Sequence, residues 1–146
     1  MIDEINHEFF KITGHSENDS LIRRRITDGK LLSKISLGAT IESQTLLEPG
    51  KIIAFFLKRK EYPQLKIIDT KTGEIKFFKR LNASHVDLRG KNHVSTDGKL
   101  IYVFYPYRGD QMMLDILDFE GRSKKQLFFK TTSFCEYCLM MDIKFE

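Results

Sequence analysis

The stretch STDGKLIYVF, residues 95–104, is similar to LEPGKIIAFF, residues 47–56. In both, a turn built on a glycine, Gly98 or Gly50, is followed by a lysine and a run of apolar residues. Glycine adopts the positive φ that tight hairpin turns require, and such turns join two antiparallel strands. Each stretch therefore predicts a β-hairpin, and the two glycines, which are 48 residues apart, predict a repeat.

The similarity continues for tens of residues after both turns. Each turn is followed by a strand, a polar break that contains proline, a second strand that ends at an aspartate, and a second glycine turn. Gly73 corresponds to Gly121 at the same spacing of 48. An earlier partial copy, residues 21–37, places Gly29 44 residues before Gly73. The chain therefore contains nearly three repeat units.

Each complete unit contains four predicted strands, and four antiparallel strands in about 40 to 50 residues is the size of one propeller blade. Numerous Phe and Tyr residues, with no Trp, also favour an all-β fold. The N-terminal strand is ambiguous, because Ile5, Phe9 and Ile12 also fit one face of a short helix. We predict a single β domain over residues 1–146, with a partial blade at 5–37, blades at 39–81 and 84–129, and closing strands at 132–146.

A closed up-and-down β-barrel is the alternative fold, since about a dozen short strands can also close on themselves. In that fold a single chain would enclose a cavity for a small molecule. The length of 146 residues is compatible with either fold, because it suits one domain with a substantial core.

Two segments resemble a known family. The run STDGKLIYVFYPY, followed by LDILDFEGRSKKQLFF, is similar to blades of the TolB-like six-bladed β-propellers, including the type common in Bacteroides-like bacteria. The resemblance covers roughly residues 20 to 130 and implies a propeller fold, but it carries no catalytic residue. Family members are several times longer and often begin with an export or lipoprotein signal, so the resemblance implies a partial or half-length propeller.

Closure of the ring is the next question, because propellers usually have about four to eight blades. The first unit has only three predicted strands before Leu37, whereas one or two predicted strands follow Thr131. We expect the tail of one chain to complete the first blade of another, so that a homodimer forms a six-bladed ring. The rival interpretation is that the chain is a fragment of a longer propeller.

The sequence contains no nucleophile elbow, phosphate-binding loop or zinc-protease motif. By fold analogy we expect a non-enzymatic binding or scaffold module without a cofactor, which contacts a protein or small molecule through loops at one end of the ring. The alternative is a metal-dependent or hydrolytic enzyme that uses polar residues of an inner strand. His85 and Asp87 would share one face of that strand, and His93 lies near its end.

A third hypothesis is a nucleic-acid-binding module. Lys58, Arg59 and Lys60 lie at a predicted hairpin tip beside Tyr62, where phosphate contacts and base stacking can combine. The net charge is only +4, however, because 20 acidic residues accompany the 24 basic ones. We therefore expect these lysines to keep a sheet edge soluble, and we do not expect a nucleic acid as the partner.

Cys135 and Cys138 have the C-x-x-C spacing of redox pairs and of half a zinc site. The helix N-terminus that activates a redox pair is not predicted here, and zinc would need two more ligands, for which His85 and His93 are weak candidates. We expect structural or incidental thiols.

No apolar run approaches the roughly 20 residues of a membrane span, and the start, MIDEINHEFF, lacks a signal-peptide pattern. The chain as written is expected in the cytoplasm, or in the envelope if it is part of a longer family member.

Overall fold

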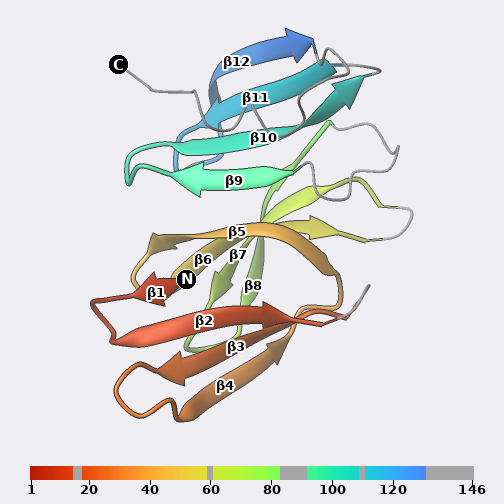
Figure 1. The fold of residues 1–146 in the computed structure, drawn as a ribbon. Helices are drawn as coiled ribbons and strands as arrows, with labels where there is room; N and C mark the ends of the chain where they lie inside the picture. The colour runs from red at the N-terminus through yellow and green to blue at the C-terminus, as the bar shows by residue number, and fades with distance from the viewer. Residues whose placement is uncertain (15–17, 59–60, 83–91, 109–110, 131–146) are drawn as a thin grey trace.

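The computed structural model describes residues 1–14, 18–58, 61–82, 92–108 and 111–130. Within these residues it contains twelve β-strands and no helix, arranged as three four-stranded antiparallel sheets. Figure 1 shows the three sheets one above another, with the first at the bottom and the third at the top. Each sheet uses four strands that are consecutive in the sequence, as a propeller blade does. The predicted all-β, blade-like fold class is therefore confirmed.

We name the sheets blades 1 to 3. Blade 1 contains β1 (Ile2–Asp3), β2 (Glu8–Thr13), β3 (Ser20–Arg25) and β4 (Leu31–Ser36). Blade 2 contains β5 (Thr40–Glu48), β6 (Lys51–Leu57), β7 (Gln64–Asp69) and β8 (Ile75–Arg80). Blade 3 contains β9 (His93–Thr96), β10 (Ile101–Arg108), β11 (Gln111–Leu117) and β12 (Ser123–Lys130).

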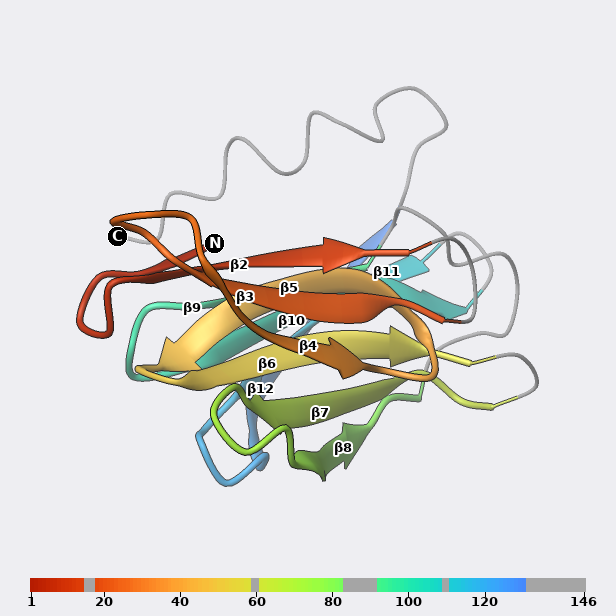
Figure 2. The ribbon, with the colours of Figure 1, turned by 90° about the horizontal axis from the view of Figure 1, so that it is seen from below.

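The alternative of a closed barrel is wrong for the described part of the chain. In each blade the first and fourth strands are edges that do not pair with each other or with another blade. The glycine turns reverse the chain within one unit, and the residues between β4 and β5 then begin a separate sheet. Blades 1 and 2 seen from below in Figure 2 are layered rather than joined edge to edge.

Blade 1 differs from the prediction of three strands before Leu37, because β1 adds a fourth that pairs Asp3 with Glu8. This strand is too short to give a periodic pattern, and side-chain contacts hold it in place. The buried Asp3 carboxylate accepts hydrogen bonds from the Gly50 amide at 2.8 Å and from Asn6. Burial raises the pKa of Asp3, but these hydrogen bonds outweigh it, and the pKa lies below its usual value.

The N-terminal hairpin bears on two points of the sequence analysis. The N-terminal segment is a hairpin rather than a short helix, with Ile5 in its exposed turn and Phe9 on β2. Blade 1 also has its four strands from within one chain, so the argument that a partner's tail must complete it is wrong. The predicted closing strands at 132–146 lie outside the described residues.

The core is organised around β6, whose five residues from Ile52 to Phe56 are all buried. Successive residues of a strand point to opposite faces. Ile53 and Phe55 belong to the core cluster between blades 2 and 3, whereas Ile52 and Phe56 belong to the cluster between blades 1 and 2. Blade 2 is therefore packed on both faces, which explains why its sequence is apolar without alternation.

The turns that revealed the repeat carry aspartates whose carboxylates could in principle act as acids or bases. Asp97 Oδ1 accepts hydrogen bonds from the Lys99 and Leu100 amides, both at 2.8 Å, and Gly98 has a φ of 83°. Asp69 and Asp118 accept comparable backbone hydrogen bonds in the β7–β8 and β11–β12 turns. These carboxylates hold hairpin turns, and turn chemistry is sufficient to explain them.

The Asp97 turn gives a prediction for acid stability. Hydrogen bonds to its carboxylate, first from the Leu100 amide and then from the Tyr102 hydroxyl and the Lys99 amide, lower the pKa of Asp97 to about 2. An unfolded aspartate has a pKa of about 3.9. Because the folded-state pKa is the lower one, this stabilisation is complete above about pH 4 and is lost as the pH falls towards 2.

We expect Asp97→Asn to keep the turn but to reduce the loss of unfolding free energy between about pH 5 and pH 2. Urea unfolding of both proteins at a series of pH values measures the difference. Parallel pH profiles for the variant and the original protein would contradict the assignment.

Candidate functional site

Loops at one end of the blades surround the candidate site. The link from β4 to β5 and the hairpin between β6 and β7 both lie on the right of Figure 1, because antiparallel strands bring alternate connections to the same end. We call this the loop end. The glycine turns that defined the repeat lie at the opposite end.

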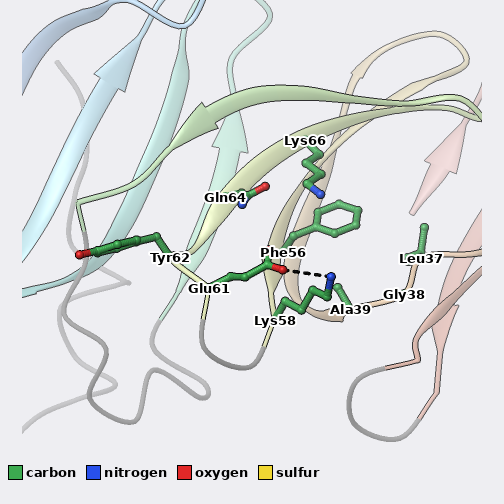
Figure 3. Close-up of a pocket in the computed structure, with 9 residues that line it drawn as sticks. All are labelled: Leu37, Gly38, Ala39, Phe56, Lys58, Glu61, Tyr62, Gln64 and Lys66. Atoms are coloured by element: carbon green, nitrogen blue, oxygen red, sulfur yellow. Dashed lines mark ion pairs between the residues drawn. The ribbon is translucent and has the colours of Figure 1, made fainter.

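A pocket of about 140 Å³ opens at the loop end between blade 2 and the link that joins blade 1 to it (Figure 3). Its apolar wall is formed by the buried residues Leu37, Ala39 and Phe56. The other lining residues are Gly38, Lys58, Glu61, Tyr62, Gln64 and Lys66. The pocket thus combines a small apolar floor with a polar and mainly basic rim.

The wall contributed by residues 37–39 is fixed by Asp19. The Asp19 amide donates to the Ala39 carbonyl at 3.1 Å, and the Leu37 amide donates to the Asp19 carbonyl at 2.8 Å. The Asp19 carboxylate also accepts the Ile41 amide at 2.7 Å. Gly38, between Leu37 and Ala39, has a φ of 60°, a conformation that other residues adopt only with strain. This side of the pocket is therefore preformed.

The cations of the rim have different surroundings. Lys58 forms a 3.0 Å ion pair with Glu61, and both side chains are about half exposed. The Lys66 ammonium lies 5.1 Å from the centre of the Phe56 ring, at the inner side of the pocket. The Tyr62 ring is covered by the Arg80 guanidinium at 3.7 Å, and Figure 3 shows Tyr62 pointing away from the apolar floor. Lys66 is therefore a cation placed over the apolar floor.

The same position between blades 2 and 3 is filled by side chains. Phe56 pairs with Gln64 across β6 and β7, and the corresponding pair on β10 and β11 is Tyr105 and Met113. Tyr105 and Met113 are at most 2% exposed, and the Tyr105 hydroxyl lies 3.9 Å from the Met113 sulfur. Burial, together with the charge of Asp115, raises the pKa of Tyr105. The pocket therefore lies at a position that is packed core in the interface between blades 2 and 3.

Only part of the predicted basic site is in the described structure. Lys58 and Tyr62 line the pocket, whereas Arg59 and Lys60 lie outside the described residues. The sequence analysis did not identify Gln64 or Lys66 as candidate site residues. The signal for Lys66 was its position on the same face of β7 as the buried Ile68.

The remaining candidates do not form a described site. His93 lies on β9, where its Nδ1 is 3.5 Å from the Ser43 hydroxyl, and that hydroxyl also accepts the Val94 amide at 3.0 Å. This contact ties β5 to β9. His85, Asp87, Cys135 and Cys138 lie outside the described residues. Across the ranges that are described, no cluster of three potential metal ligands occurs and no helix could cross a membrane.

Comparisons with known proteins agree with the fold. No family model and no curated protein matches the chain. Among solved structures, it is similar to the crystal structure of TolB from Acinetobacter baumannii, with a TM-score of 0.61 and 16% sequence identity. The match covers 89% of this chain but only 31% of that one. The chain therefore has a TolB-like propeller fold and spans about a third of the length of this structural relative.

The interface comparison predicts the effect of filling the pocket. We expect Gln64→Met, which introduces the residue found at the equivalent position of blade 3, to raise the free energy of unfolding by about 0.5–2 kcal/mol. The matched control is Gln111→Met on an exposed position of β11, with an expected change near zero. Urea unfolding measures both. Destabilisation by Gln64→Met would mean that the Gln64 amide supports the fold rather than the pocket.

Proposed function

We propose that this chain is a non-enzymatic binding module that recognises an acidic group of a protein partner at the loop-end pocket. The observation that carries the proposal is the position of Lys66, whose ammonium lies over the Phe56 ring beside an apolar floor. Among the described residues Lys66 forms no ion pair, so its charge is available to a ligand. An ammonium beside apolar surface attracts a carboxylate more strongly than one in bulk water.

The size of the pocket supports a side-chain anchor rather than a cofactor. Pockets for drug-sized ligands have volumes of roughly 300–1,000 Å³. A volume of about 140 Å³ admits a single functional group with a short apolar attachment. A glutamate side chain or a chain-terminal carboxylate of another protein has this chemistry, and Gln64 adds an amide donor at the rim.

Lys58 is the second cation of the rim, and its ammonium can exchange one carboxylate partner for another. Exposed ion pairs contribute only about 0–1 kcal/mol, so its pair with Glu61 can open at little cost when a ligand carboxylate arrives. Lys58 would then add to the affinity, whereas Lys66 would determine it.

The nucleic-acid hypothesis has weaker support from the same residues. Binding of a nucleic-acid phosphate backbone needs several cations along the path of the nucleic acid. Here Lys58 is paired with Glu61, and Arg80 covers one face of the Tyr62 ring. The enzyme hypothesis depends on His85 and Asp87, which lie outside the described residues, and it stays a prediction.

The proposal is tested with a defined probe, an N-acetylated Leu-Glu dipeptide, titrated into isotopically labelled protein. We expect amide shifts at Gly38, Gln64 and Lys66, and at least about tenfold weaker binding for Lys66→Ala, as loss of a charged hydrogen bond predicts. The matched control is Lys76→Ala on β8, whose ammonium pairs with Glu74 and which lies opposite Ile67, on the other face of the sheet from Lys66.

Equal affinity for Lys66→Ala and the original protein would contradict the proposal, as would shifts confined to the opposite end of the blades. Tight, steeply salt-dependent binding of an oligonucleotide that is lost in Lys58→Ala would favour the nucleic-acid hypothesis instead.

A further inference from the structure

An exposed aromatic side chain lies beside one of the pocket residues on blade 2. Phe77 of β8 is 63% exposed, which is the highest value for an aromatic side chain among the described residues. It pairs directly with Lys66 across β7 and β8. Directly opposite residues of an antiparallel pair share a face of the sheet and lie about 4.5–5.5 Å apart. Phe77 therefore lies on the same face of blade 2 as the pocket cation Lys66.

Blade 1 covers only part of this face. At the turn end, Ile68 and Ile75 pair with each other, and both belong to the packing between blades 1 and 2. The Ile35 side chain of blade 1 also reaches this end, because a Cβ added to Gly73 would meet it at 3.7 Å. Towards the loop end, in contrast, the ring of Phe77 is largely exposed. Figure 2, which is seen from the side of blade 1, shows β8 beyond the ribbon of β4, so this corner of blade 2 is open.

The interface between blades 2 and 3 shows how a charge at the position of Lys66 is matched. Lys66 and Asp115 each lie three residues before the aspartate of their glycine turn. Asp115 is 1% exposed and forms a 3.5 Å ion pair with Lys79 of blade 2. The counterpart of Lys79 in blade 1, six residues after the turn glycine, is Ile35. Blade 1 thus has an apolar residue at the place where blade 2 has a matching charge, and a carboxylate from a partner would supply that charge.

The spacing between the cation and the exposed ring fits an extended peptide. The Lys66 ammonium lies 5.1 Å from the centre of the Phe56 ring, which belongs to β6, whereas Phe77 belongs to β8. Adjacent strands are about 4.7–4.9 Å apart, so one to two strand spacings, about 5–10 Å, separate the two positions. In an extended peptide, alternate side chains point the same way and lie about 6.6 Å apart. One peptide can therefore place an acidic side chain at Lys66 and the side chain two positions away at Phe77.

We propose that the protein partner presents an extended segment that contains an acidic residue and, two positions away, an apolar residue. The acidic side chain binds at Lys66, and the apolar side chain covers the ring of Phe77 and removes it from water. This inference rests on the proposed function, because the pocket supplies the acidic anchor. It adds the contact that selects among acidic segments, since a carboxylate alone is common to most proteins.

The test compares two N-acetylated and C-amidated peptides, Leu-Thr-Glu-Thr-Leu and Ala-Thr-Glu-Thr-Ala, by chemical-shift titration of the full chain. Both peptides are symmetric about the glutamate, so the test does not depend on the direction in which the segment binds. We expect the leucine peptide to bind at least about fivefold more tightly, because it removes more apolar surface from water. Phe77→Ala should abolish this preference and leave the affinity for the alanine peptide nearly unchanged, whereas Lys66→Ala should weaken the binding of both peptides about tenfold.

The matched control is Phe128→Ala, which removes an exposed ring from the outer strand of blade 3 and should change neither affinity. A second measurement needs no variant. In the original protein, the Phe77 amide should shift on addition of the leucine peptide and much less on addition of the alanine peptide.

A leucine preference that survives Phe77→Ala would overturn the inference, and so would equal affinity of the original protein for the two peptides. If Lys66→Ala still weakened binding in either case, the proposed function would stand without the second contact. Failure of both peptides to bind, or equal affinity of Lys66→Ala and the original protein, would contradict the proposed function and this inference together.

Discussion

Burial of β6 on both faces is the constraint on which the rest of the structure depends. A strand at the centre of a lone sheet can leave one face in water, but Ile53 and Phe55 point into one core while Ile52 and Phe56 point into another. Blade 2 therefore needs a neighbour on each side, and full burial of each such side chain contributes about 1.5–3 kcal/mol. Polar contacts join the same neighbours at their edges, such as the 3.5 Å ion pair between Lys79 of blade 2 and the buried Asp115 of blade 3.

The candidate sites are departures from this repeated interface. Where blades 2 and 3 meet, Tyr105 and Met113 complete the core, and where blades 1 and 2 meet, Gln64 and Lys66 leave a pocket with a positive rim. Repetition thus supplies an internal reference, and positions that differ from their counterparts identify surfaces with a separate role.

Much of the fold could be predicted because turn chemistry is local. Gly50, Gly98 and their flanking residues impose a hairpin whatever surrounds them, so their spacing revealed the blades. Strand β1 could not be predicted, because two residues carry no period and Asp3 is held by the Gly50 amide of another blade. The pocket was located only in part. Lys58 was visible as part of a charge cluster, whereas the importance of Lys66 depends on which way a strand faces and on the gap left by a distant linker.

Native-state hydrogen exchange of the β6 amides tests the central claim most directly. If β6 is enclosed by both neighbouring blades, its amides open only when the whole array unfolds, and they should exchange more slowly than those of the outer strands β4 and β8. Their opening free energy should equal the global free energy of unfolding measured in urea. Exchange of the β6 amides at the rate of β8, with an opening free energy well below the global value, would mean that the blades open independently and would contradict the account.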